Sequence, residues 1–419
     1  MHDSTLTGTA AGGGVTASKG YQWLLIALLS FNFGIVFFDR NALNFLTPFI
    51  QPELNLSNAQ IGLFASALSL SWAIAGLFIG WLSDKLGRRK LLLVIATLIF
   101  SAASVLSGIA ASFAALLGAR LLMGIAEGGI MPISQTLIAA EVAHERRGLA
   151  QGLTQNFGAN LIANFLGPIV IVWMGSEYGW REAFYLCAIP GFLSAVLIAF
   201  FVREPARPAA AAGPKAKVPL LPLLTDRTMI LCVLISTLLV SFFVVFMAFT
   251  PLYLTTVRGI DNQNMSFIMS SFGLASIAVA FLVPGSSDRL GRKPVAIAAS
   301  LVGLVLPLGV LATSGNAMLP IVLSFVFGCC ISGVFPLVMA TIPSESVSPA
   351  QTATALSLTM GISEIVGGVV APYVAGNLAD LYGLPVVLWI LAGICLACGL
   401  LAMLLPETAP RVLARRART

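Results

Sequence analysis

The 419-residue chain is 58% hydrophobic and only 10% charged, and its mean hydropathy is +0.96. Soluble domains carry about 25% charged residues, so this composition excludes an ordinary soluble protein. A helix needs about 20 apolar residues to cross a bilayer, and the chain is long enough for about a dozen such helices. The apolar runs have helical length and show no strand pattern, which predicts an all-α integral membrane protein.

Charged, Gly, Pro and Asn residues divide the chain into twelve apolar runs. The predicted membrane helices span residues 21–48, 58–83, 89–111, 114–141, 147–173, 181–203, 227–255, 263–286, 293–313, 318–343, 350–375 and 384–405. These runs predict an N-terminal six-helix bundle at 21–203 and a C-terminal six-helix bundle at 227–405. A Pro- and Ala-rich linker at 204–226 joins them, and residues 1–20 and 406–419 are expected to be tails.

Most of the 23 Lys and Arg residues fall in the tails, the linker and every second loop. The positive-inside rule then predicts a multi-pass protein of the cell membrane with both termini cytoplasmic, and we expect the bacterial inner membrane. The net charge of +6 is explained by this orientation and by contact with the lipid bilayer. No nucleic-acid partner is expected, because the chain lacks a soluble face to bind one.

The six cysteines all lie in apolar runs, and the chain has only two histidines. This distribution indicates packing residues rather than a disulfide framework or a metal site. No motif for a cofactor is present either, so we expect a protein that is not an enzyme.

The two halves of the chain are related by a shift of 204 positions, which aligns residues 84–88 (DKLGR) with residues 288–292 (DRLGR). The same shift matches Gly124 with Gly328, Gly129 with Gly333, Pro132 with Pro336, Glu141 with Glu345, and Pro168 with Pro372. This indicates a duplication. With six helices in each half the repeat is parallel, an architecture typical of alternating-access carriers that bind substrate between the halves near the middle of the membrane.

Residues 80–90 (GWLSDKLGRRK) resemble the signature loop between helices two and three of the major facilitator superfamily. Within that superfamily the pair Asp39 and Arg40, the pair Arg120 and Glu127, and residues 180–184 (WREAF) resemble the anion:cation symporter branch. That branch includes bacterial sugar-acid and aromatic-acid carriers and relatives of sialin and the vesicular glutamate transporters. The resemblance implies that these four charged residues are the acid and base positions of the carrier.

Five charged side chains fall well inside the predicted helices: Asp39, Arg40, Arg120, Glu127 and Glu364. Each costs about 2.5–3.5 kcal/mol to insert, so each needs a partner or a function. Arginine binds carboxylates through a planar fork, which makes the two arginines the candidate substrate-binding residues. The three acids are the candidate proton-coupling residues. Two alternatives stay open: ion pairs that only fix helix packing, and an Arg40 that is neutralised by its neighbour Asp39.

Charge balance indicates how substrate and proton would be linked. The charges of Arg40 and Arg120 are balanced by those of Asp39 and Glu127. An entering carboxylate therefore makes the cavity negative, and a proton restores neutrality. Binding of the substrate and of the proton should therefore favour each other.

Helix five carries Asn156, Asn160 and Asn164 at a spacing of four, which places one polar stripe on an apolar helix. Asn32 lies seven residues before Asp39, on the same helical face. These amides are candidate substrate-binding groups for hydroxyls, and hydrogen bonding between helices is the alternative.

The repeated loop also predicts a gate. A carboxylate at Asp84 is expected against the positive start of helix eleven, and Asp288 against the start of helix five. Arg88 and Arg292, in the same two loops, are expected to take part in the gating.

Together these patterns predict a monomeric, proton-coupled importer of a small organic anion, either a sugar acid or an aromatic acid. A proton-driven exporter of drugs or metabolites and a nutrient sensor that does not transport are the alternatives.

Overall fold

The computed structural model describes residues 18–143, 146–205, 223, 225–313, 315, 317–348 and 351–416, apart from the side chains at 77, 81, 84, 148, 156, 353 and 416. Most of the predicted N-terminal tail and linker therefore lies outside the described residues. In the described part all regular structure is helical, and twelve helices are long and apolar enough to cross a membrane. This confirms the predicted fold class.

The N-terminal half holds the first six of these helices. They are α1 (Lys19–Leu54), α2 (Asn58–Leu86), α3 (Arg89–Gly108), helix four from α4 (Phe113–Gly128) and α5 (Ile130–Glu141), helix five from α6 (Arg147–Gly152), η2 (Leu153–Phe157), η3 (Ala159–Leu166) and α7 (Gly167–Glu177), and α8 (Trp180–Phe201). Local sequence explains their ends. Ser57 and Gln60 form a capping box at the start of α2, and Gly87 ends that helix in the left-handed region, at φ 63°.

The C-terminal half repeats this order. It holds α10 (Arg227–Leu252) with η4 (Tyr253–Val257), α11 (Asn262–Leu290), helix nine from α12 (Arg292–Gly303) and α13 (Val305–Ala312), helix ten from α14 (Met318–Gly328), η5 (Cys329–Gly333), α15 (Val334–Pro336), η6 (Leu337–Thr341) and α16 (Ile342–Ser346), helix eleven from α17 (Thr352–Ser363), η7 (Glu364–Val370) and α18 (Ala371–Tyr382), and α19 (Pro385–Ala402). A short helix, α20 (Pro410–Arg416), follows.

Several helices run past their predicted ends. Helix α1 begins inside the expected tail and continues to Leu54 rather than residue 48, through Pro48 and Pro52. Helix eleven continues to Tyr382 rather than 375. A proline removes only one backbone hydrogen bond. Within a bilayer the other backbone groups find no water as a hydrogen-bond partner, so they stay bonded in the helix and the helix persists. Conversely, α3 ends at Gly108, three residues before its predicted end.

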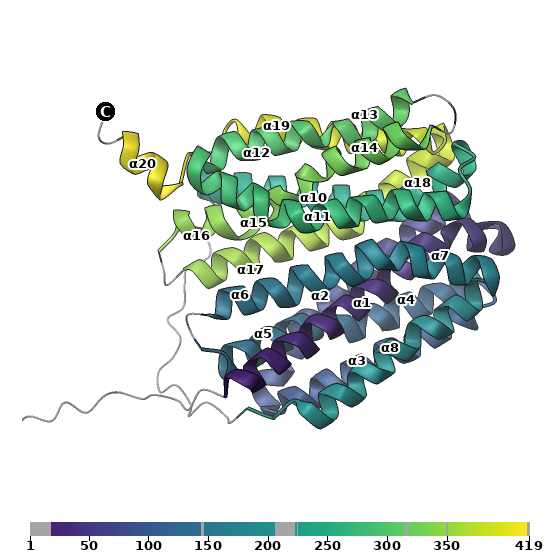
Figure 1. Cartoon of the computed structure of the whole chain (residues 1–419), viewed down its shortest axis with the longest axis horizontal. Helices are drawn as coiled ribbons and strands as arrows, with labels where there is room; N and C mark the ends of the chain where they lie inside the picture. The colour runs from purple at the N-terminus through teal and green to yellow at the C-terminus, as the bar shows by residue number, and fades with distance from the viewer. Residues whose placement is uncertain are drawn as a thin grey trace, which may run out of the picture.

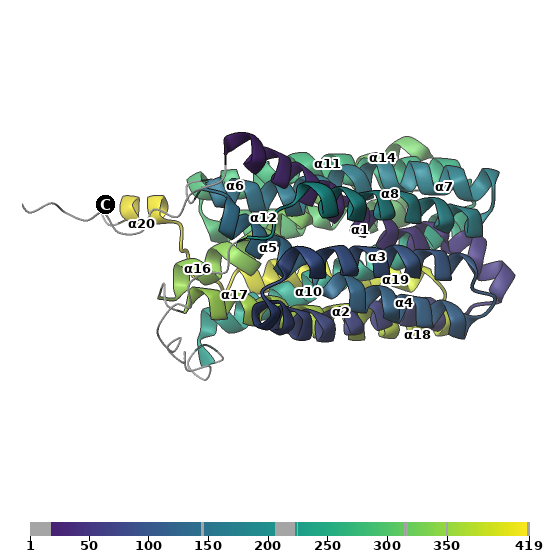
Figure 2. The same cartoon turned by 90° about the horizontal axis from the view of Figure 1, so that it is seen from below.

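The two halves pack side by side, the N-terminal one in purple to teal and the C-terminal one in green to yellow (Figure 1). The loops with the Lys and Arg residues at 85–90, 146–147 and 289–293 share one end of the bundle, which we call the basic end. Between the halves, α2 packs on α18 and η7, and α11 packs on η3 and α7. Since α2 begins and α18 ends at the opposite end, the α2–α18 seam joins the halves there (Figure 2).

A carboxylate and a glycine hold that seam together. The Oδ atoms of Asp380, near the end of α18, accept hydrogen bonds from the backbone N–H groups of Asn58 (2.8 Å) and Ala59 (2.9 Å) at the start of α2. Gly376 lies one turn earlier in α18, where a Cβ would collide with the carbonyl oxygen of Asn58. The missing side chain lets the two helices approach closely enough for the carboxylate to cap α2.

The duplication extends to the seams nearer the middle of the bundle. Gly273 of α11 lies directly against the backbone of Asn164 in η3. In the other seam a Cβ on Gly368 of η7 would lie 3.1 Å from the Cβ of Ser69 in α2. Positions 69 and 164 are related to 273 and 368 by the 204-residue repeat. The halves therefore touch at two equivalent points, each made by a small residue.

Candidate functional site

One buried charge pair lies inside the N-terminal half. Asp39 of α1 is fully buried, and its Oδ1 accepts a hydrogen bond from Ser104 Oγ of α3 at 2.7 Å. Arg120 of α4 is 1% exposed, donates from Nη2 to Ser107 Oγ at 2.7 Å and lies over the Phe184 ring at 5.4 Å. The two charges act on each other. The hydrogen bonds to Ser104 and Ser107 hold α1 and α4 against α3.

A second pair is more open. The Arg40 Nη1 atom lies 3.9 Å from Glu127 Oε2, and the side chains are 17% and 0% exposed. Both carboxylate oxygens of Glu127 are buried without a hydrogen-bond partner among the described residues. The alternative in which Asp39 neutralises Arg40 is not what the structure favours, because successive side chains of a helix point in different directions and Arg40 faces Glu127. Helix four instead supplies the partner of Arg40.

Asn32 belongs to the interior of the N-terminal half. It is fully buried, and its Oδ1 accepts hydrogen bonds from Ser194 Oγ at 2.8 Å and from Thr97 Oγ1 at 3.3 Å. These contacts join α1, α3 and α8. They favour the packing alternative for Asn32 over the predicted contact with substrate.

The asparagine stripe of helix five forms a chain of amides with α1. Asn41 Nδ2 donates to Asn164 Oδ1 at 3.2 Å, and Asn164 Nδ2 donates to Asn160 Oδ1 at 3.1 Å. Asn44 donates to Asn41 at 3.4 Å, which extends the chain. The side chain of Asn156 lies outside the described residues. Sequence reasoning missed Asn41, although its place directly after Arg40 was a usable signal.

Both helices that carry the polar stripe and Glu364 widen into π-helical turns at these residues. Asn160 and Asn164 belong to η3, and Glu364 is the first residue of η7. Glu364 is half-buried, and the positive charge of Arg40 acts on it. The charge of Arg40 therefore acts on one carboxylate in its own half, at 3.9 Å, and on one in the other half. Short π-helical segments occur frequently at functional sites.

The second copy of the signature loop forms a charge cluster at the basic end. Arg292 pairs with Asp288 Oδ1 at 2.6 Å and with Glu345 Oε1 at 2.9 Å. Glu407 caps α12 by accepting from the backbone N–H of Arg292 at 2.7 Å. Asp288 is thus bound within its own half rather than against the start of helix five, where we expected it. Neither Glu345 nor Glu407 was predicted, although Glu345 repeats Glu141 of the first half.

The first copy of the loop has a matching cap. Glu204 accepts from the backbone N–H of Lys90 at 3.1 Å and also from that of Arg89, at the start of α3. Arg88 is exposed and makes no side-chain cap. The side chain of Asp84 lies outside the described residues, so its role in a gate stays a prediction.

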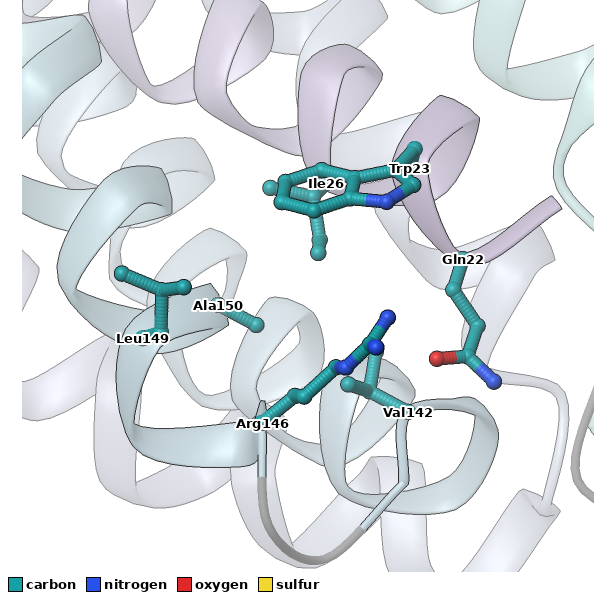
Figure 3. A pocket seen from close by; sticks show the side chains of 7 residues that line it. All are labelled: Gln22, Trp23, Ile26, Val142, Arg146, Leu149 and Ala150. Atoms are coloured by element: carbon teal, nitrogen blue, oxygen red, sulfur yellow. The ribbon is translucent and has the colours of Figure 1, made fainter. Parts of the chain in front are cut away.

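A small pocket at the basic end lies apart from these charges, between α1 and the turn from α5 to α6 (Figure 3). It is lined by Gln22, Trp23, Ile26, Val142, Arg146, Leu149 and Ala150. Apart from the Arg146 guanidinium and the Gln22 amide the lining is mainly apolar, and it does not include Arg40 or Glu127. Among the described residues no group of three His, Cys, Asp or Glu side chains could hold a metal ion.

Two equivalent six-helix bundles, with ionisable side chains buried within membrane-spanning helices, define a membrane carrier. The family model of the Major Facilitator Superfamily matches residues 29–365, and the chain belongs to this family. It is a transporter and not an enzyme.

Curated relatives extend over most of the chain. A probable sulfoacetate transporter of Cupriavidus necator is 27% identical over 91% of this chain and 93% of its own length. A hexuronate transporter of Bacillus subtilis is 30% identical over 73% of this chain and 76% of its own length. A multidrug resistance protein of a Rahnella species is 27% identical over 81% of this chain and 82% of its own length.

Solved structures share the fold. An inward-facing bacterial homologue of the human lysosomal transporter Spinster superposes with a TM-score of 0.73 at 19% identity, covering 93% of this chain and 96% of that one. A nucleoside transporter superposes with a TM-score of 0.75 at 18% identity, covering 90% of this chain and 98% of that one.

Proposed function

We propose that this chain is a proton-coupled symporter that imports a small organic carboxylate across a bacterial inner membrane, as a monomer with both termini and the basic end in the cytoplasm. One observation carries the proposal: Arg40, partly exposed, shares its charge with the buried carboxylate of Glu127 across 3.9 Å. The relatives named for sulfoacetate and hexuronate support an organic acid as substrate.

Arg40 is the group that receives the substrate carboxylate. Charge-assisted hydrogen bonds between arginine and carboxylate are about 2.7–2.9 Å long. The Arg40–Glu127 distance is well beyond this, so the guanidinium keeps its fork free for a closer partner. Arg120 is almost completely buried and donates from Nη2 to Ser107, which supports a role in positioning α4 and Asp39.

Glu127 couples the proton. When a substrate carboxylate binds Arg40, two carboxylates compete for one guanidinium in a medium where unpaired charge is costly. A proton on Glu127 removes that cost. Asp39 is the second acid of the same half, and its charge acts on Glu127. Substrate binding and protonation thus stabilise each other, and the loaded carrier changes conformation with the charge balanced.

Rocking of the two halves completes the cycle. The α2–α18 seam closes the end opposite the basic end, so release occurs toward the basic end, which the positive-inside rule assigns to the cytoplasm. Opening to the other side breaks the Asp380 cap.

Uptake into proteoliposomes tests this function. A pH gradient, acidic outside, should drive accumulation of a labelled acid from a panel of sugar acids, hydroxybenzoates and short dicarboxylates, and a protonophore should abolish it. The multidrug resistance relatives define the competing result. Proton-driven efflux of cationic drugs, with no acid accumulated, would overturn the proposal.

A further inference from the structure

Glu364 stands out among the charges of the site because it comes from the C-terminal half. The other charged groups around Arg40 all belong to α1 or α4. Glu364 begins η7, which packs on α2 of the N-terminal half and on α10 of its own half. It is half-buried, and the charge of Arg40 reaches it.

The duplication identifies what occupies the same position in the first half. The 204-residue shift pairs Glu364 with Asn160, one of the asparagines of helix five. Both positions are half-buried, and each lies on a π-helical segment, η7 or η3. Equivalent positions of a parallel repeat lie at the same depth on opposite sides of the axis between the halves. Asn160 and Glu364 are therefore expected at the same depth in the membrane, on opposite sides of the axis between the halves.

On the N-terminal side this level is polar but neutral. Asn160 is linked through Asn164 to Asn41, the neighbour of Arg40. Amides both donate and accept, so they accommodate many hydroxyl orientations. On the C-terminal side the equivalent position holds a carboxylate, which accepts hydrogen bonds strongly and repels anions.

We propose that Glu364 determines substrate specificity by contacting the end of the substrate that points away from Arg40. It accepts a hydrogen bond from a hydroxyl group there and rejects a second acidic group. This inference rests on the proposed function and narrows it. The carried acids are monocarboxylates with a hydroxyl group remote from the carboxylate, and dicarboxylates and unsubstituted acids are disfavoured.

The supply of positive charge supports this selection. Arg120 is buried with Asp39 inside the N-terminal half, whereas the partly exposed Arg40 is the described arginine whose charge acts on Glu364. A second substrate carboxylate on that side would face Glu364, and among the described residues no arginine other than Arg40 acts on it. A site built to bond a hydroxyl also rejects the analogue that lacks one, because its buried acceptor is then left unpaired.

Matched ligands test the inference with purified protein, by displacement of a bound labelled acid or by thermal shift. One series is gluconate, glucarate and hexanoate, six-carbon acids with a remote hydroxyl, a second carboxylate or neither. The other is 4-hydroxybenzoate, terephthalate and benzoate, which vary the same feature on a ring. In whichever series the protein binds, we expect the hydroxylated monocarboxylate to bind about 10- to 100-fold more tightly than its two analogues.

Variants assign the selection to Glu364. In Glu364→Gln the dicarboxylate should gain at least tenfold relative to the hydroxy acid, whereas Glu364→Asp should keep the native order. Ser363→Ala, which changes the buried neighbour on the same turn, is the matched control and should also keep it. Should Glu364→Gln fail to fold, the native ratios and the aspartate variant still decide.

The possible failures are distinct. If the native protein binds the three acids of a series equally, or if Glu364→Gln leaves the ratios unchanged, the inference is wrong while the proposed function stands. If the protein binds no organic acid in either series but takes up cationic drugs, the proposed function fails and the inference fails with it.

Discussion

Arg40 on α1 and Glu127 on α4 form a loose ion pair of 3.9 Å in which the acid is fully buried and the base is partly exposed. The asymmetry separates their roles. The exposed partner can exchange one carboxylate for another, whereas the buried partner can only change its protonation. Both belong to the N-terminal half, so in the proposed rocking motion the pair moves as a unit.

The exposure of the two arginines predicts different effects of the same change. Arg40→Lys keeps the charge but removes the fork, so substrate affinity should fall at least tenfold while the protein stays folded. Arg120→Lys removes the hydrogen bond to the buried Ser107 and should lower thermal stability as well as binding. Ligand titration and thermal unfolding of both variants separate the cases. Equal loss of affinity with unchanged stability in both would show that Arg120 also contacts substrate.

Glu127→Gln fixes the neutral state of the residue that we propose couples the proton. The amide has the size of the protonated acid, so substrate should still bind, and exchange of labelled for unlabelled substrate across liposomes should persist. Accumulation driven by a pH gradient should be lost, because the variant no longer gains or releases a proton.

The pH dependence of binding provides the second readout for Glu127. Protonation of the acid favours substrate, so the affinity of the native protein should decrease as pH rises, and the affinity of Glu127→Gln should stay level over the same range. Asp39→Asn serves as the comparison within the same half. Parallel pH curves for native protein and the glutamine variant would reassign the coupling to Asp39 or Glu364.

The sequence predicted features that recur or that follow from membrane energetics. Helix number follows from apolar length, and the two-half architecture follows from the 204-residue repeat. The five charges inside the predicted helices were found because such charges are rare in a bilayer. The repeat also pairs Asn160 with Glu364, a relationship that gained meaning only once η3 and η7 were seen at the seam.

Pairing between helices could not be predicted in the same way. Two charges adjacent in sequence, Asp39 and Arg40, have different partners because a helix turns about 100° per residue. Asn32 shares a helical face with Asp39 yet packs against α3 and α8. The caps by Glu204 and Glu407 join segments more than a hundred residues apart, so no local pattern announced them.

These two caps predict a matched loss of stability. Glu204→Gln weakens the cap of α3, and Glu407→Gln weakens that of α12; each should cost about 0.5–2 kcal/mol of unfolding free energy. The caps lie in different halves, so the double variant should show the sum of both losses. Thermal or denaturant unfolding in detergent measures them. Losses within error of zero would show that Gln caps as well as Glu and that the charge contributes nothing.

The cap that joins the halves should instead control which side of the carrier is closed. Asp380→Asn removes the charge that holds Asn58 and Ala59 of α2, so the opposite end should open more often. Spin labels at the exposed residues Ala111 and Leu319, one in each half, should show a larger population of long label-to-label distances in this variant. Asp261→Asn is the matched control, because Asp261 caps α11 at the same end but within one half, by accepting from Asn264 N–H at 2.9 Å. The control should keep the native distance distribution. If both variants shift the distribution equally, the effect is general loosening of helix ends, and Asp380 has no special part in closing the carrier.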